Sequence, residues 1–160
     1  MKDVRADDYQ SRYACGFVGS LGMGVGRDGF VLSSDRMTAV KFFDRKERFL
    51  RELEVYRVLA AKGIRKVAGH TVPRFVRADE QLLAIEMTIV TRPFVLDFAG
   101  AKRPHEVPDF DPEIIEEHMA HLRELFEDRW TDALHVAEMF RQKTGFVLLD
   151  IHPGNIAFAD

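Results

Sequence analysis

The N-terminal half of the chain alternates short apolar runs with turn-forming residues. Residues 13–18, 30–32 and 37–43 are mainly aromatic, β-branched or small, and glycines or a Ser-Ser-Asp-Arg turn separate them. Runs and breaks of this kind predict an antiparallel meander. Another strand is predicted at 72–79, and the nearly continuous apolar run at 82–90 is typical of a central strand. The pattern therefore predicts five strands.

A helical repeat of apolar positions follows the third predicted strand. In residues 44–62, Phe49 and Tyr56 belong to a stripe of apolar residues that recur at helical spacing. Asp44 suits the N-cap of this helix and Gly63 suits its C-cap. The pattern predicts one long helix packed against the sheet.

The C-terminal part of the chain predicts two more helices. The first begins at Pro112, with acidic residues in its first turns, and the second covers residues 132–143. The apolar positions of the first are Ile115, Met119, Leu122 and Phe126. Residues 96–111, rich in proline and charge, are predicted to form a linker, and residues 1–12 are predicted to be loosely held.

Composition and charge limit the function classes. The chain has 160 residues, 46% of them hydrophobic, which suits one globular domain. A net charge of −3 gives no basic excess, which argues against a nucleic-acid partner. No apolar run approaches the ~20 residues of a membrane span. Cys15 has no second cysteine to pair with, and no secretory signal is evident, so we expect a cytoplasmic protein.

A glycine-rich corner stands out in the predicted meander. Gly24, Gly26 and Gly29, followed by Val31, fit the pattern G-x-G-x-x-G-x-V. Glycines let a backbone approach phosphates closely and adopt positive φ at little cost. A dinucleotide-binding site would require a helix directly after the glycines, and a strand is predicted there instead. A flexible hairpin explains the glycines equally well, and Gly22 could open the motif in another register.

Lys41 lies between apolar residues on the third predicted strand. Burying an ammonium group without a partner is costly, so a lysine in this context suggests a paired, functional group. Two carboxylates of the long helix are candidate partners. Glu52 shares the side of the helix that carries Tyr56, whereas Glu54 lies beside Arg57, which can pair with it locally. We therefore predict that Lys41 pairs with Glu52. The simpler alternative is that both are exposed surface charges.

Near the C-terminal end, an apolar run stops at Asp150, a Pro-Gly turn follows, and Asn155 opens a second apolar run. A strand-loop-strand of this kind can present one carboxylate and one amide to a shared point. The aspartate can accept a proton or orient a hydroxyl group, and the asparagine can offer an oxygen to a hard cation.

These features occur in an order that resembles the protein-kinase-like superfamily: a glycine-rich hairpin, Ala39-Val40-Lys41, an Arg51-Glu52 helix and Asp150-Ile151-His152-Pro153-Gly154-Asn155. The last stretch is most similar to the D-x-H-P-G-N loop of atypical kinases of the ubiquinone-biosynthesis type. Small-molecule kinases of the aminoglycoside and choline type are similar in outline.

The resemblance implies an α+β fold. It consists of an antiparallel five-stranded N-lobe sheet with one control helix and a minimal helical C-lobe. It spans residues 1–160 as one kinase-like domain, with an N-lobe at about 13–95, the linker at 96–111 and a reduced C-lobe with the catalytic loop at 112–160.

The resemblance also implies ATP and Mg²⁺ as ligands. Lys41, held by Glu52, would grip the phosphates under a loop formed by Gly24, Gly26 and Gly29. The backbone from Glu86 to Thr88 would meet the adenine edge. Asp150 would orient or deprotonate the acceptor hydroxyl, and Asn155 would bind Mg²⁺.

The chain departs from the kinase pattern at several positions. Leu148-Leu149 stands in place of His-Arg, and His152 replaces the usual lysine. No D-F-G motif follows the loop. Asp160 would lie about 16 Å from Asn155 in an extended chain, at about 3.3 Å per residue, which is too far for both to bind one ion.

Two functions are therefore open. One is a minimal phosphotransferase that moves the ATP γ-phosphate to an unknown hydroxyl. The other is an inactive, pseudokinase-type module that binds a nucleotide or a partner, or one piece of a split kinase whose C-lobe a protein partner completes.

Overall fold

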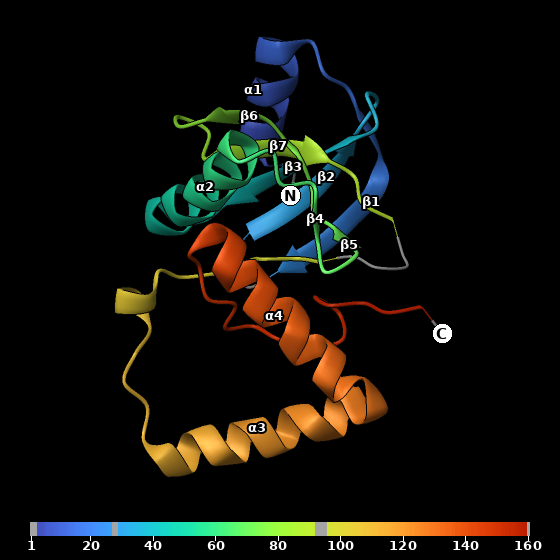
Figure 1. Ribbon diagram of the computed structural model, residues 1–160. Helices are drawn as coiled ribbons and strands as arrows, with labels where there is room; N and C mark the ends of the chain where they lie inside the picture. Colours follow the sequence, from blue (N-terminus) through green and yellow to red (C-terminus); the bar gives the residue numbers. More distant parts are fainter. Residues whose placement is uncertain (1–2, 27–28, 92–95, 160) are drawn as a thin grey trace. The chain divides into compact units, whose positions relative to one another are not determined.

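The computed structural model describes residues 3–26, 29–91 and 96–159. The chain divides into two compact units (Figure 1). The first comprises Met1–Arg57 and Pro73–Ile89, and the second comprises Val58–Val72 and Val90–Asp160. The division differs from the predicted lobe boundaries because residues 58–72 group with the C-terminal half of the chain.

A five-stranded antiparallel sheet forms the centre of the first unit. Its order is β1–β2–β3–β7–β6, and all neighbouring strands are antiparallel. The strands are β1 (Phe17–Gly26), β2 (Gly29–Ser34), β3 (Thr38–Phe43), β6 (Phe75–Asp79) and β7 (Ala84–Thr88). The prediction of an α+β fold with a five-stranded antiparallel sheet is confirmed.

Each face of the sheet carries one helix. Alternate residues of a strand point to opposite faces, so Phe42 and Lys41 on β3 face different helices. Phe42 packs against Tyr9 of α1 (Val4–Tyr13), with ring centroids 5.8 Å apart. On the other face, Phe43 packs against Phe49 of α2 (Lys46–Ala61), also at 5.8 Å. Both central-strand aromatics are fully buried, which fixes both helices on the sheet.

Helix α1 corrects the prediction that residues 1–12 are loosely held. Asp3 caps its N-terminus by accepting a hydrogen bond from the Arg5 backbone N–H at 2.9 Å. Ala14 ends it in the left-handed conformation. Only Ala6 and Tyr9 are buried within the helix, so its apolar signal is confined to a few positions in a polar sequence.

The second unit holds the remaining elements. Two short strands, β4 (Lys66–Val67) and β5 (His70–Thr71), pair as a hairpin that the sequence pattern did not reveal. They are followed by η1 (Pro104–Glu106), α3 (Pro112–Phe126), η2 (Glu127–Arg129) and α4 (Trp130–Thr144). No helix in the described residues is both long and apolar enough to cross a membrane.

The predicted helix positions in this unit hold, with shifts at the ends. Helix α3 begins at Pro112 as predicted, and Asp111 caps it. Helix α4 begins two residues before the predicted start and ends at Gly145, whose φ is +79°. The predicted linker contains local structure: Leu96 pairs with Ile156 and Lys102 pairs with Val147 in isolated bridges, and residues 104–106 form η1.

Candidate functional site

Lys41 and Glu52 form a largely buried ion pair in the first unit. Lys41 Nζ lies 2.6 Å from Glu52 Oε2, and the two side chains are 13% and 7% exposed. The ammonium also lies 4.8 Å from the centroid of the Phe43 ring. The Phe43–Phe49 contact anchors α2 on this face and brings Glu52, one turn further along, over Lys41. The predicted contact is therefore present, and Glu54 is exposed.

The strand register places the glycine-rich hairpin in line with Lys41. Gly24 pairs with Val31, and Val31 pairs with Lys41 on the next strand. Gly26 pairs with Gly29 at the end of the hairpin. Adjacent strands are about 4.8 Å apart, so the Gly24 backbone lies roughly 10 Å from that of Lys41, on the sheet that carries the ion pair. The connecting residues 27–28 of the predicted motif lie outside the described residues.

Gly29 has a structural reason to be glycine. Its φ is +140°, and a Cβ there would lie 1.8 Å from the carbonyl oxygen of Phe42. Only glycine permits β2 and β3 to approach this closely. The glycine at this position is therefore required by the sheet, whether or not the hairpin binds a ligand.

The sequence predicts that the backbone from Glu86 to Thr88 meets an adenine edge, and this stays a prediction. Glu86 lies within β7, between β3 and β6, where it pairs with Val40 and Arg77. Its side chain is 1% exposed and faces α1. The Thr88 backbone N–H donates to the Arg74 carbonyl at 3.0 Å.

Glu86 is the centre of a buried polar network. Its carboxylate accepts hydrogen bonds from the hydroxyls of Tyr9 at 2.8 Å and Thr38 at 2.6 Å. Arg77 Nε lies 2.9 Å from Glu86 Oε2. Burial, together with the bond to Glu86, raises the pKa of Tyr9, so this hydroxyl stays a donor. The network ties α1 to the middle of the sheet.

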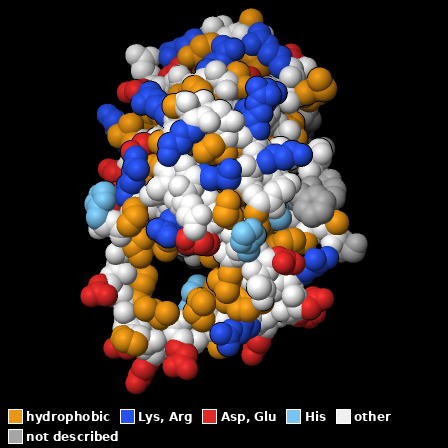
Figure 2. Space-filling model, in the orientation of Figure 1, with side chains coloured by type: hydrophobic (Ala, Val, Ile, Leu, Met, Phe, Trp, Pro, Cys, Tyr) orange, Lys and Arg blue, Asp and Glu red, His pale blue; other side chains and the backbone are white. Residues whose placement is uncertain are grey.

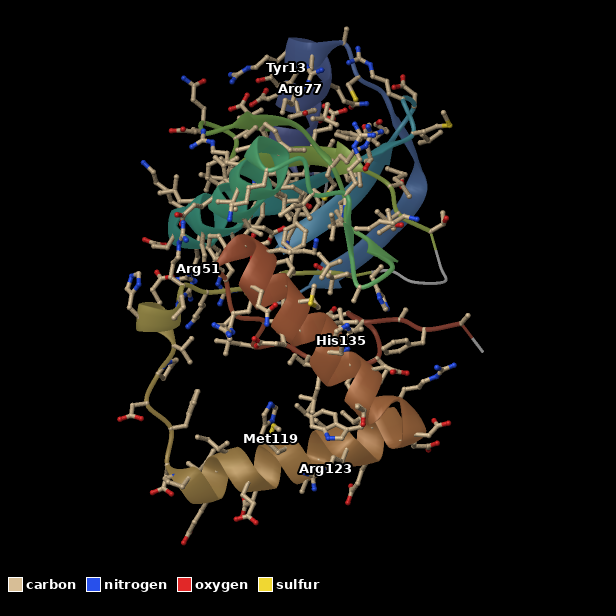
Figure 3. The ribbon with its side chains drawn as sticks, viewed as in Figure 1. Tyr13, Arg51, Arg77, Met119, Arg123 and His135 are labelled. Atoms are coloured by element: carbon tan, nitrogen blue, oxygen red, sulfur yellow. The ribbon has the colours of Figure 1, made fainter. Side chains whose placement is uncertain are left out.

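A second acidic group extends this network to the edge strand. Figure 3 shows Tyr13 beside Arg77, whose guanidinium lies 4.7 Å from the ring centroid. The Tyr13 hydroxyl and Arg12 donate to Asp79 Oδ2 at 2.8 and 2.7 Å. Burial raises the pKa of Asp79, but the bonds from the Leu82 N–H, Tyr13 and Arg12 outweigh it, and the net pKa is lowered. No pattern in the sequence indicates these contacts beyond the charges themselves.

Asp150 and Asn155 lie in a tight loop of the second unit. Asn155 Nδ2 donates to the Asp150 carbonyl at 2.8 Å, which fixes the orientation of the amide. The Asn155 backbone N–H donates to the His152 carbonyl at 2.9 Å, and its carbonyl accepts from the Asp97 N–H at 2.8 Å. The Asn155 side chain is buried, whereas that of Asp150 is 66% exposed. The loop thus holds one amide inside and presents one carboxylate outward.

His152 shapes the same loop. Its Nδ1 accepts a hydrogen bond from the Gly154 N–H at 3.0 Å, so the proton of the neutral ring is on Nε2. Nε2 lies 3.8 Å from Asp150 Oδ2, at the outer limit of an ion pair. A histidine therefore stands near the candidate catalytic carboxylate, beyond hydrogen-bond distance.

The donor set of this loop suits a hard cation only in part. With Nδ2 committed to the Asp150 carbonyl, Asn155 keeps Oδ1 as an oxygen ligand. Among the described residues, no group of three or more His, Cys, Asp or Glu side chains is arranged to hold a metal ion. A magnesium ion here would therefore depend on oxygens supplied by a bound phosphate.

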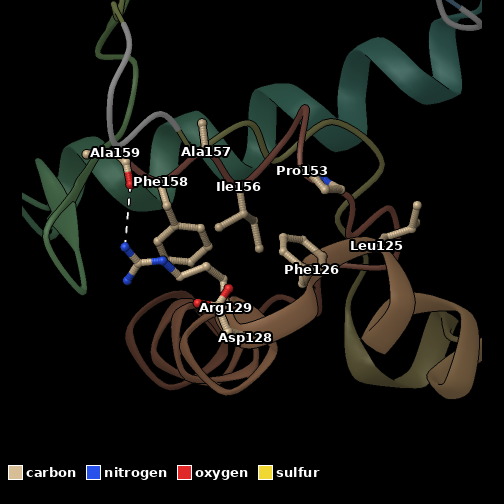
Figure 4. A pocket seen from close by; sticks show the side chains of 9 residues that line it. All are labelled: Leu125, Phe126, Asp128, Arg129, Pro153, Ile156, Ala157, Phe158 and Ala159. Carbon is tan, nitrogen blue, oxygen red and sulfur yellow. Dashed lines mark hydrogen bonds between the residues drawn. The ribbon is translucent and has the colours of Figure 1, made fainter.

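A cavity of about 450 Å³ adjoins the loop within the second unit. Figure 4 shows its walls, which come from the end of α3, from η2 and from the segment after Asn155. The lining residues are Leu125, Phe126, Asp128, Arg129, Pro153, Ile156, Ala157, Phe158 and Ala159. Pro153 and Ile156 connect it to the loop, but Asp150 is not part of its lining.

Comparisons with known proteins do not show a family for this chain. No protein-family model matches the chain, and no curated protein matches it by sequence. Among solved structures, the streptomycin-ATP-APH(2")-IIa ternary complex is similar, with a TM-score of 0.43 and 10% sequence identity. The match covers 89% of this chain and 57% of that chain, so this chain spans less than two thirds of the other. The function has to be argued from the residues themselves.

Proposed function

We propose that this chain is a kinase-like nucleotide-binding protein, in which the first unit grips the phosphates of ATP. The observation that carries the proposal is the Lys41–Glu52 ion pair. A lysine on the central strand of a sheet, with its ammonium held at 2.6 Å by a helix carboxylate, is a fixed positive charge and not a mobile surface group.

The burial of the pair supports a role in binding. Removing two charges from water costs several kcal/mol, and their attraction does little more than offset that cost. Such a pair adds little to stability, and two apolar side chains would fill the same place without the penalty. A pre-positioned ammonium is, in contrast, well suited to an anionic ligand, because it loses little freedom when the ligand binds.

The glycine-rich hairpin would cover the phosphates in this proposal. Gly24 and Gly26 lie on β1. Strand β2 separates β1 from β3, the strand that carries Lys41 and Phe43. Backbone N–H groups of a glycine-rich segment can approach phosphate oxygens more closely than those of other residues. Gly29 would then serve the sheet and not the ligand, because the close Phe42 carbonyl already accounts for it.

In the second unit, Asp150 would act on the acceptor. Its exposed carboxylate would accept the proton of an acceptor hydroxyl while that oxygen forms its bond to the γ-phosphorus. The bond from the γ-phosphorus to the β–γ bridging oxygen would break in the same transfer, and ADP would leave. Asn155 Oδ1 would hold Mg²⁺, and the bound ion would neutralise part of the negative charge of the phosphates.

Binding without turnover is the second candidate function. The observation that favours it is the absence, among the described residues, of a cluster of acidic side chains that could hold a metal ion beside Asn155. Without a well-held cation, phosphoryl transfer loses the component that offsets most of the developing charge. The chain would then bind the nucleotide as a module of a larger assembly, and its partner would supply any missing ligand.

The test is thermal unfolding with and without Mg-ATP. At a nucleotide concentration about one hundred times the dissociation constant, binding should add about 2.7 kcal/mol to the free energy of unfolding. Lys41→Met should reduce the shift, whereas Lys62→Met, a lysine whose ammonium donates to the Lys143 carbonyl, serves as the control. Absence of any shift at millimolar nucleotide would exclude nucleotide binding.

A second variant separates the two candidate functions. Asp150→Asn should leave the thermal shift intact, because the carboxylate is 66% exposed and lies 3.8 Å from His152 Nε2, beyond hydrogen-bond distance. If the wild type transfers phosphate to a hydroxyl acceptor or to water, Asp150→Asn should abolish that turnover. If the wild type binds ATP and shows no turnover, the binding function stands and the phosphotransferase does not.

A further inference from the structure

Helix α3 has an apolar face that its own chain covers only in part. The stripe Ile115, Met119, Leu122 and Phe126 runs along one side of the helix. Leu122 and Phe126 are buried beside α4, whereas Ile115 at the other end is 48% exposed. The two helices meet at η2 and diverge toward the start of α3 (Figure 1). The first half of the stripe therefore faces open space.

More apolar side chains extend this surface. Ile114 is 55% exposed, and Phe110, directly before the helix, is 46% exposed. Elsewhere in the described residues, the large exposed hydrophobic side chains lie singly on different elements, as Val4, Met37 and Val76 do. Figure 2 shows hydrophobic side chains around an opening in the lower part of the view, between α3 and α4. Grouped apolar exposure of this kind is typical of an interaction site.

The same segment carries a concentrated negative charge. Residues 106–128, which we name the acidic arm, contain nine acidic residues and one arginine, a net charge of −8 with neutral histidines. All nine acidic residues are exposed. They are Glu106, Asp109, Asp111, Glu113, Glu116, Glu117, Glu124, Glu127 and Asp128. Because the whole chain has a net charge of −3, the rest of it carries +5.

The charges border the apolar face instead of interrupting it. Glu116 lies three residues before Met119, and Glu117 lies three residues after Ile114, so one carboxylate stands at each edge of the exposed half of the stripe. An occupant of this face must therefore offer apolar side chains in the middle and cations on both flanks. A basic amphipathic helix has that arrangement, since its charged residues flank an apolar stripe.

We propose that the acidic arm is a docking site for a basic amphipathic helix of a partner protein. A second copy of this chain fits less well, because pairing arm with arm would oppose two segments of charge −8. Its other surfaces offer only isolated apolar side chains. An anionic membrane surface would be repelled by the same charge. This inference does not depend on nucleotide binding.

The probe is a fluorescently labelled Leu/Lys peptide of about four helical turns, with leucines at helical spacing. Two controls are a peptide of the same composition in scrambled order and a Leu/Glu peptide with the same leucine positions. Fluorescence anisotropy against the full chain should show binding of the Leu/Lys helix alone. Raising NaCl from about 0.01 to about 0.15 M, which shortens the Debye length from about 30 to about 8 Å, should weaken it.

Variants locate the site. The double substitution of Ile114 and Ile115 by serine should weaken binding by about tenfold or more, since both side chains would be buried by the partner. Val76→Ser, at an exposed position of the first unit, is its matched control. Glu117→Lys should also weaken binding, and Glu80→Lys, the same charge change in an exposed turn, should not. Circular dichroism confirms that each variant is folded.

Several results would overturn the proposal. Equal binding of the scrambled peptide would indicate charge attraction without a docking face, and binding of the Leu/Glu peptide would contradict the charge argument. Unchanged affinity in the Ile114/Ile115 variant would place the site elsewhere. A dimer in sedimentation that the same variant dissociates would assign the face to a second copy of the chain.

Discussion

The buried Glu86 carboxylate permits the sharpest test of the architecture. Glu86→Ala removes the hydrogen-bond acceptor of the Tyr9 and Thr38 hydroxyls and the ion-pair partner of Arg77. Tyr9 is fully buried, and the Arg77 side chain is 34% exposed. In the variant, neither the Tyr9 hydroxyl nor the Arg77 guanidinium becomes fully hydrated. Both polar groups therefore lose the Glu86 carboxylate without gaining water in its place.

The magnitude follows from the burial of the network. Removing one member of a buried ion pair costs about 3–5 kcal/mol, because the remaining charge stays desolvated. Tyr9→Phe removes a single hydrogen bond to a charged acceptor and should cost about 1.5–3 kcal/mol. A domain of this kind is stable by only about 5–15 kcal/mol, so Glu86→Ala should remove a large part of the total.

Urea unfolding at neutral pH measures both losses, and the double variant supplies their coupling. Because the Tyr9 hydroxyl donates directly to Glu86, the two losses should not add, with a coupling energy of about 0.5–3 kcal/mol. Glu80→Ala, an exposed carboxylate in the turn before β7, is the control and should change stability by about 0.5 kcal/mol or less. A loss below about 1 kcal/mol for Glu86→Ala would refute the reasoning. A weaker affinity for ATP at unchanged stability would indicate that Glu86 contributes to nucleotide binding.

Three further predictions concern other parts of the fold. The pKa of Asp79 is lowered from its ordinary value of 3.8, so its carboxylate stabilises the fold above pH 3.8. This contribution is lost as the pH falls through the lowered pKa. Asp79→Asn should therefore flatten the acidic part of a plot of unfolding free energy against pH. Gly29→Ala should prevent normal folding, since its Cβ would lie 1.8 Å from the Phe42 carbonyl oxygen. Gly63→Ala, at φ +63° with open space around it, is the comparison and should cost about 1–2 kcal/mol in urea unfolding. Asp111→Ala removes the acceptor of the Glu113 N–H at the start of α3 and should cost about 1 kcal/mol, with helicity lost on circular dichroism; full helicity would deny the cap a role.

The sequence was sufficient where local periodicity determines the answer. The alternation of β3 puts Lys41 and Phe43 on one face, and the helical spacing of α2 puts Phe49 and Glu52 on one side. Packing the two apolar residues together then brings the charged pair within reach, so the contact could be predicted. Turn residues and apolar runs likewise sufficed for the meander, because neighbouring antiparallel strands need only short connections.

The sequence was insufficient where a residue depends on a distant partner. Tyr9 and Glu86 are 77 positions apart, and Tyr13 and Asp79 are 66 apart. Nothing local distinguishes such residues from surface polar groups, which is why α1 was predicted as loose chain and the contact between Tyr9 and Glu86 was not predicted. The strands β4 and β5 were missed for another reason, since two residues are too few to show an alternating pattern.

Asn155 offers a way to separate the fold of the loop from its proposed chemistry. Asn155→Asp keeps an oxygen for a cation but loses the N–H that donates to the Asp150 carbonyl, and it places a carboxylate against that oxygen. The variant should lose about 1–3 kcal/mol of stability, because the side chain is buried. Asn155→Ala loses both the donor and the oxygen. If Asn155 holds the cation, the gain in ATP affinity on adding Mg²⁺ should persist in Asn155→Asp and vanish in Asn155→Ala, as isothermal titration can measure. An equal gain in both variants would make Asn155 a purely structural residue, since the amide would then serve only to close the loop on the Asp150 carbonyl.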